Sequence, residues 1–176
     1  VLQSSMRHPV LLLPREDQVI FDEGYGGNWD MGFLSNASVF DARDTTFVGT
    51  LARGVEARAF TVEFLPRVPV EAAGYRALRF AFHPGFSDVG ARQAFNVMAN
   101  EDAPSQVLLL DVEEPQIDMT LREWQQVEIP LERFYRLEEP ISSLRLLGNL
   151  HGTFYFDDVR LIAAQQGTII TAVTEE

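Results

Sequence analysis

The sequence predicts an all-β fold, either a sandwich or a barrel. Apolar residues recur at every second position in short runs, which is the period of a half-buried strand. Gly, Pro, Asn and Asp separate these runs at the short intervals typical of antiparallel β proteins. A helical period is hard to find, and the one candidate helix of any length covers residues 118–126.

The expected strands follow each other along most of the chain. Residues 58–64 alternate with Phe60, Val62 and Phe64 on one face, and Pro66 ends the run. Residues 75–83 alternate in the same way before Pro84 and Gly85. The other expected strands cover residues 19–21, 95–100, 106–111, 124–131, 141–147 and 153–162.

Composition limits the classes of function that the chain can have. With 176 residues, the chain fits a single domain that can bury a sizeable core. No cysteine is present, which excludes disulfides, thiolate metal sites and cysteine nucleophiles. The net charge of −12 opposes binding of nucleic acid or of an anionic membrane surface, but it is compatible with neutral glycans and with cations. No apolar run reaches the 18 residues that suggest a membrane-spanning helix.

Four segments, in this order, resemble the strands of galactose-binding-like jelly-roll carbohydrate-binding modules. They are residues 19–23 followed by Trp29, residues 75–80, residues 124–131 with the pattern Trp-x-x-Val-x-Ile-Pro-Leu, and residues 153–161 with Asp157-Asp158 before Val159. The resemblance implies a two-sheet antiparallel β-sandwich (jelly roll) over residues 19–162. We expect Trp124 to lie in its core. Residues 1–18 are then a lead-in or linker, and residues 163–176 a C-terminal edge strand or linker.

The resemblance also implies a function. A module of this kind is non-catalytic and binds a polysaccharide or oligosaccharide on a concave sheet face. It belongs to a larger secreted or cell-surface protein, where it holds an attached catalytic domain near its substrate. The same sandwich carries modules for different glycans and some without a known ligand, so function has to be argued from the site.

Two acidic pairs are expected to form a structural calcium site. Asp22 and Glu23 end the opening strand, and Asp157 and Asp158 lie in the closing strand. In a jelly roll these two strands are often neighbours, and carboxylate oxygens are ligands that Ca²⁺ prefers. Asp157 has the parity of Val159, so it faces inward if no bulge intervenes. Two solvated acidic turns are the alternative.

The expected ligand residues come from two runs and a Gly-rich loop. Arg79, His83, Asn96 and Asn100 lie on the non-core side of runs taken to be adjacent, and Tyr25 and Trp29 lie near Gly24–Gly27. Aromatic planes with a few convergent polar groups suit a sugar site. Each residue also has a structural alternative: core packing for Trp29, a surface position for His83, Asn96 and Asn100, and pairing with an acid such as Asp111 for Arg79.

Two other functions stay open. The chain contains no Gly-x-Ser-x-Gly, His-Glu-x-x-His or phosphate-loop motif, so it is expected not to be an enzyme. A jelly-roll polysaccharide lyase would need Arg79, His83 and Gln93 gathered on one face. An accessory or interaction domain without a glycan ligand would have a face of Met and aliphatic residues, and Phe33 and Phe86, both expected in loops, suit either function.

Overall fold

The computed structural model describes residues 16–101, 105–134, 137 and 139–164. Its regular secondary structure is almost entirely antiparallel strand, which confirms the predicted all-β class. The strands are β1 (Gln18–Phe21), β2 (Trp29–Ala42), β3 (Ala52–Pro66), β4 (Tyr75–His83), β5 (Asp88–Val89), β6 (Phe95–Ala99), β7 (Ser105–Leu108), β8 (Gln125–Pro130) and β9 (Leu144–Ala163). Two short 3₁₀ turns cover Ala72–Gly74 and Leu131–Arg133.

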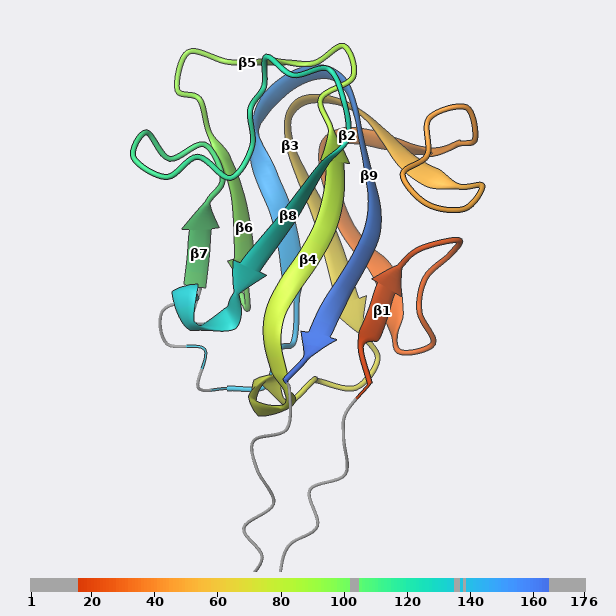
Figure 1. Cartoon of the computed structure of the whole chain (residues 1–176), viewed down its shortest axis with the longest axis vertical. Helices are drawn as coiled ribbons and strands as arrows, with labels where there is room; N and C mark the ends of the chain where they lie inside the picture. The colour runs from red at the N-terminus through yellow and green to blue at the C-terminus, as the bar shows by residue number, and fades with distance from the viewer. Residues whose placement is uncertain (1–15, 102–104, 135–136, 138, 165–176) are drawn as a thin grey trace, which may run out of the picture.

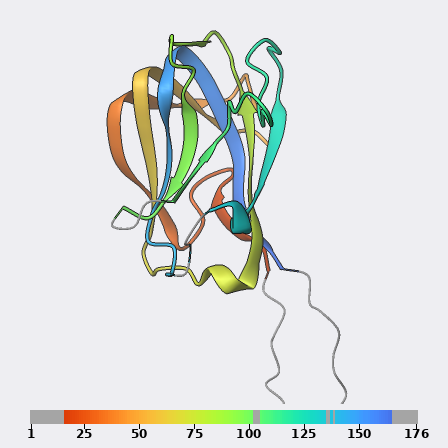
Figure 2. The same cartoon turned by 90° about the vertical axis from the view of Figure 1, so that its left-hand side faces the viewer.

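Three long strands connect the two layers of the sandwich. β2, β3 and β9 each bend over the top of the molecule, so that the first half of β9 lies in the back layer and its second half in the front layer (Figures 1 and 2). The bends are aligned across the sheet, because Ala37 pairs with Ala57 and Ala57 pairs with Gly152. Left-handed backbone occurs at these bends, at Asn36, Ala59 and Gly152.

Hydrogen bonding assigns the strands to the layers. In the back layer, β3 lies between β2 and the first half of β9, and β6 joins that half of β9 to β7. In the front layer, the second half of β9 lies beside β4, which pairs with β8. β1 pairs with β9 on the other side, with Phe21 opposite Val159. The opening and closing strands are therefore neighbours, as predicted.

Alternating aromatic and branched residues fill the space between the layers. Phe60 and Phe82 both pack against Phe95 and Phe154, with ring centroids 4.8–5.7 Å apart. Phe156 packs against Phe21 and Phe64 in the same core. The contacts of Phe60 with Phe95 and of Phe156 with Phe21 and Phe64 are edge-to-face, and such contacts stabilise a core beyond the burial of apolar area.

Several local predictions differ from the structure. Residues 118–124 form turns rather than a helix, because the Asp118 carboxylate accepts hydrogen bonds from the N–H and hydroxyl of Thr120. β2 was not predicted, since two bulges interrupt its alternation. The expected run at 141–147, from Leu144 onward, and the run at 153–162 belong to one strand, β9, while Ile141 forms only an isolated bridge with Val70. Residues 1–15 and 165–176, which make up most of the expected linkers, lie outside the described residues.

Candidate functional site

The outer face of the back layer carries two rows of side chains that cross its strands. One row places Glu63, Arg145, Met98 and Gln106 opposite each other on β3, β9, β6 and β7. The next row runs from β2 to β7. This second row consists of Ser35, Thr61, Leu147, Asn96 and Leu108. We call the two rows, together with Phe33 and Leu65, the sheet-face surface.

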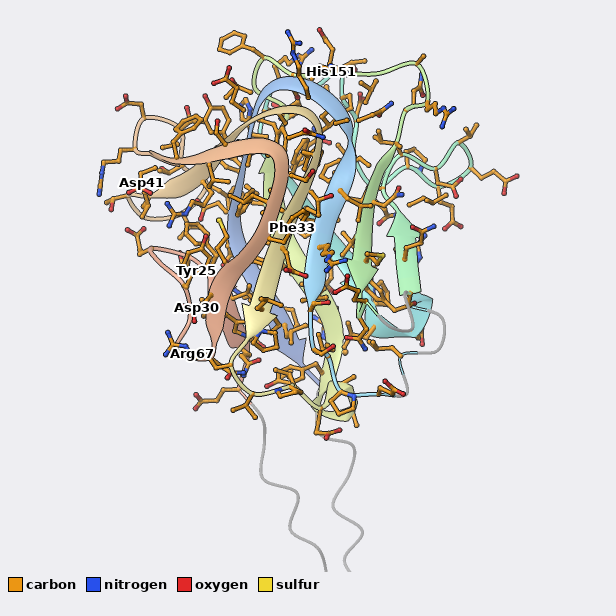
Figure 3. All side chains as sticks on the ribbon, turned by 180° about the vertical axis from the view of Figure 1, so that it is seen from behind. Tyr25, Asp30, Phe33, Asp41, Arg67 and His151 are labelled. Atoms are coloured by element: carbon orange, nitrogen blue, oxygen red, sulfur yellow. The ribbon has the colours of Figure 1, made fainter. Side chains whose placement is uncertain are left out.

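Three apolar side chains of the sheet-face surface are well exposed. Phe33 is 58% exposed, Leu108 45% and Leu65 38%. Phe33 is seen near the centre of the back layer when the molecule is viewed from behind (Figure 3). The residue lies in β2 and not in a loop, which corrects the sequence prediction. A ring held on a strand is positioned more rigidly than a ring on a loop.

A nearly buried ion pair lies beside Phe33. Arg145 contacts Glu63 at 2.6 Å and Glu101 at 3.0 Å, and Glu63 also accepts the backbone N–H of Phe33 at 2.9 Å. Burial alone would lower the pKa of Arg145, but the hydrogen bonds and charges of the two carboxylates raise it above its usual value. Arg145 therefore stays charged, and its contacts with the two carboxylates place fixed polar groups beside the exposed ring. The sequence signal for Glu63 was its outward place in the alternation of residues 58–64.

A depression of about 490 Å³ lies at the β6–β7 side of the sheet-face surface. Asn96 and Leu108 belong to both the surface and the depression. The lining residues combine polar and apolar groups: Arg92, Gln93, Ala94, Asn96, Leu108, Leu110, Asp111, Val112 and Glu113. Asn96, which is partly exposed, therefore lies where the sheet-face surface meets the depression.

The predicted residues Asn96 and Asn100 have different environments although both come from one run. Asn100 is 7% exposed, and its side-chain oxygen accepts hydrogen bonds from the N–H and hydroxyl of Ser142. Its amide group donates to the Pro140 carbonyl, and its backbone is left-handed with a φ of 59°. Asn100 thus holds two chain segments together, which matches a structural role more closely than a ligand contact.

Arg79 and His83 are not on the same wall as Asn96. β4 and β6 both pair with β9, but β4 pairs with its second half and β6 with its first half, in different layers. The expectation that the two runs are adjacent is therefore wrong. Arg79 pairs with Asp158 at 3.4 Å rather than with Asp111. His83 packs against Trp124 and Tyr155, with centroids 5.4 and 5.9 Å apart.

The two residues expected from the Gly-rich loop are also placed by packing. Trp29 is fully buried, and its indole N–H donates to the side chain of Gln18 at 3.1 Å. Trp29 therefore packs in the core, which was the structural alternative for this residue, and no ring face is free for a ligand. Tyr25 is half-buried beside Phe21, with the Arg53 guanidinium 5.3 Å from its ring centre. Burial raises the pKa of the Tyr25 hydroxyl.

The four predicted metal ligands gather near the edge where β1 meets β9. Asp22 contacts Arg160 at 3.4 Å, and the same guanidinium pairs with Asp158. Glu23 accepts hydrogen bonds from the backbone N–H and hydroxyl of Thr50, which lower its pKa. Arginine thus supplies positive charge beside two of the four carboxylates.

Asp157 lies on the outer face of the front layer and is fully buried. A bulge with left-handed backbone at Asp158 changes the parity, so Asp157 pairs with Ala81 and does not face inward. Its carboxylate accepts the N–H groups of Phe47, Val48 and Asp158. Burial raises the pKa of Asp157. The three backbone N–H groups oppose this rise, and the negative charge of Asp22 adds a smaller upward contribution.

The fit of this cluster to a cation is limited in the described arrangement. Most carboxylate oxygens already accept hydrogen bonds or pair with arginine, and only Asp22 Oδ1 is buried with neither kind of partner. Within residues 16–164, as far as they are described, no group of three or more His, Asp and Glu side chains is arranged to hold a metal ion. Calcium therefore stays a prediction.

Comparisons with known proteins agree on the fold. A scan against protein-family models and a search of curated proteins find no match for the sequence. Among solved structures, the chain is similar to a family 29 carbohydrate-binding module, with 10% identity and a TM-score of 0.52 over 82% of this chain and 86% of that chain. It is also similar to the family 11 module of the cellulosomal cellulase Lic26A-Cel5E of Clostridium thermocellum, with 14% identity and a TM-score of 0.51 over 86% and 96%.

A third similar structure is an enzyme. It is an exo-1,3/1,4-β-glucanase from a Pseudoalteromonas species, with 17% identity and a TM-score of 0.62; the match covers 93% of this chain but 23% of that chain. Identities this low establish the fold alone. The chain has the jelly-roll β-sandwich fold seen in carbohydrate-binding modules, as its sequence predicted.

Proposed function

We propose that the chain is a carbohydrate-binding module that binds a polysaccharide along the sheet-face surface. The observation that carries this proposal is the position of Phe33, more than half exposed on a broad strand-built face beside the Glu63–Arg145 pair. An exposed ring can stack on the apolar face of a sugar, while fixed polar groups nearby bind its hydroxyls. The similarity to modules of families 29 and 11 supports this choice of ligand.

The ligand is proposed to be an uncharged glycan. The net charge of −12 repels acidic polysaccharides as well as nucleic acids. In the described part of the chain, no helix is long and apolar enough to cross a membrane. One stacked ring and a few hydrogen bonds give an affinity in the micromolar to millimolar range, about −4 to −8 kcal/mol.

The module is further proposed to act in a larger secreted or cell-surface protein. The part of the glucanase that this fold matches is joined in one chain to a much longer remainder, which supports an attached catalytic domain here. Weak binding is sufficient in such a protein, because tethering gives the catalytic domain a high effective concentration of substrate. The module itself is proposed to be non-catalytic: Arg79 and His83 lie on β4, whereas Gln93 precedes β6 in the other layer, so a lyase-like group is not assembled.

A structural calcium ion remains part of the proposal. Its support is that Asp22 Oδ1 is buried without a hydrogen-bond partner and that Asp22 and Asp157 are close enough for their charges to interact. A cation beside these two groups would relieve the cost of burying charge. The ion would be held by Asp22 and Asp157, with backbone carbonyls supplying the remaining oxygens.

Affinity gel electrophoresis tests the sheet-face surface. Gels contain a mixed-linkage β-1,3/1,4-glucan, a xylan or a galactomannan, and the Phe33→Ala variant is compared with the wild type. Val68→Ala is the matched control, since Val68 is 66% exposed and lies outside the surface. We expect at least one glycan to retard the wild type and the control, and to retard Phe33→Ala less. Equal retardation of all three proteins would reject Phe33 as a ligand contact.

A second function is favoured by the aliphatic part of the same surface. Leu65, Leu147, Leu108 and Met98 accompany the single aromatic residue Phe33, and such a face suits packing against another protein domain. The chain would then be an accessory or interaction domain. Absence of retardation of the wild type by every glycan of the panel would favour this function over glycan binding.

A further inference from the structure

A second set of side chains crosses the outer face of the front layer. Phe40 on β2 pairs with Gly54 on β3, which pairs with Tyr155 on β9, which pairs with His83 on β4. The rings of Phe40, Tyr155 and His83 thus lie in one cross-strand line. Figures 1 and 2 show that this layer lies opposite the layer that carries the sheet-face surface.

Two further rings pack beside this line. Trp124, which immediately precedes β8, packs against His83 with centroids 5.4 Å apart. Phe47 packs against Trp124 at 5.8 Å. The five rings form what we call the aromatic strip: Phe40, Tyr155, His83, Trp124 and Phe47. All five are partly exposed, so Trp124 is not the core residue that the sequence predicted.

The backbone leaves room for the aromatic strip at two glycines. A β-carbon at Gly54 would overlap the ring of Phe40, so this ring lies directly over the glycine. A β-carbon at Gly85 would lie 2.9 Å from the Tyr155 ring, and the left-handed backbone of Gly85 disfavours other residues as well. Neighbouring rings meet at 53–83°, and these contacts hold each ring in place.

A pocket of about 500 Å³ opens at the centre of the strip. Tyr155 and His83 form part of its wall, and Phe86, which is 87% exposed, stands at its side. Arg122 and Asp88 add polar groups. Arg122 is fixed by hydrogen bonds to the carbonyls of Gly85 and Ser87 and by an ion pair with Asp88 at 3.1 Å.

We propose that the aromatic strip and its pocket are a second binding site, for an uncharged polysaccharide chain. Partly exposed rings that meet at 53–83° offer several ring faces and edges to the apolar faces of sugars, and the pocket brings Arg122, Asp88 and Thr45 within reach of sugar hydroxyls. The choice of an uncharged glycan as ligand rests on the proposed function. The aromatic strip and its pocket share no residue with the sheet-face surface. Since the two surfaces lie on opposite faces of the sandwich, one molecule binds two chains and links them.

Variants of the two surfaces separate this inference from the proposed function. The probe is the soluble mixed-linkage β-1,3/1,4-glucan, in affinity gels and in calorimetry with its oligosaccharides. Phe86→Ala removes only an exposed ring, so its folding is not in question, and Trp124→Ala shortens the strip. Phe33→Ala changes the other surface alone, and Val68→Ala remains the control.

We expect Phe86→Ala and Trp124→Ala to weaken retention about tenfold, which corresponds to about 1.4 kcal/mol. Calorimetry should give two oligosaccharides per wild-type chain and one per chain in each single-surface variant. Wild-type retention in both Phe86→Ala and Trp124→Ala overturns the inference. Loss of retention in these two variants, with Phe33→Ala unchanged, supports the strip and rejects the sheet-face surface. No retention of the wild type by the mixed-linkage glucan, and none by the xylan or the galactomannan of the panel, rejects both.

Discussion

The carboxylate of Asp157 accepts the backbone N–H of Phe47 at 2.9 Å, across 110 positions of the sequence. Together with the bond from Val48, this contact fastens the loop between β2 and β3 onto the closing strand. The same loop carries one ring of the aromatic strip and the Thr50 partner of Glu23. A single buried carboxylate therefore connects the fold of the front layer with the position of a proposed binding surface.

Asp157→Ala should lower the free energy of unfolding by about 3 kcal/mol, since one buried and two part-buried backbone N–H groups then lose their acceptor. Urea denaturation measures this change. Asp30→Ala is the control, because Asp30 is exposed and pairs with Arg67 at the surface, where such pairs contribute little. A loss no larger in Asp157→Ala than in the control would contradict the anchoring role.

Calcium should raise the melting temperature of the wild type if the acids beside β1 and β9 bind it. We expect the melting temperature to fall in chelator and to recover with added Ca²⁺, and Asp22→Asn to abolish the difference. Ligand binding to the folded state alone stabilises it by mass action. The same melting curve with chelator and with calcium would reject the ion and leave Arg160 as the counter-charge of Asp22 and Asp158.

Stability should fall on acidification because of His83. Burial lowers the pKa of His83 from its ordinary value of 6.5, and the nearby charge of Arg122 lowers it further, while the neutral ring accepts the N–H of Gly85. The unfolded chain then binds the proton more readily, so this stabilisation is complete above pH 6.5 and is lost as the pH falls toward the folded-state pKa.

The variant His83→Gln should therefore lose less stability than the wild type between about pH 7.5 and pH 5.5, on either side of the ordinary histidine pKa. Urea denaturation at the two pH values measures the difference, with the surface variant His151→Gln as control. Equal losses in His83→Gln and wild type would show that other groups cause the pH dependence.

Arg145→Leu should cost about 3 kcal/mol, because the nearly buried Glu63 then lacks its charged partner. Replacing both residues, as Glu63→Leu and Arg145→Leu together, should restore most of this loss, since neither charge is left unpaired. Chemical denaturation of the two single variants and the double variant gives the coupling energy. Additive effects of the two substitutions would show that the pair does not act as a unit.

The strand pattern was readable from sequence where one face of a strand is buried. Phe60, Val62 and Phe64 alternate because they enter the core, and the same holds for Phe80 and Phe82. The neighbouring places of the opening and closing strands followed from the resemblance to jelly-roll modules. β2 was missed because bulges shift its register, and residues 118–126 were misread because an Asp118 turn competes locally with a helix.

The candidate sites were less readable because they combine residues that only the tertiary structure brings together. The line from Phe40 through Tyr155 to His83 depends on the register of four strands, and the bulge at Asp158 decides which way Asp157 points. The hydrophobic period and the turn residues predict only the local structure of each segment. Which outward-facing residues meet across strands is decided by the bends of β2, β3 and β9 and by their register, which the hydrophobic period does not encode.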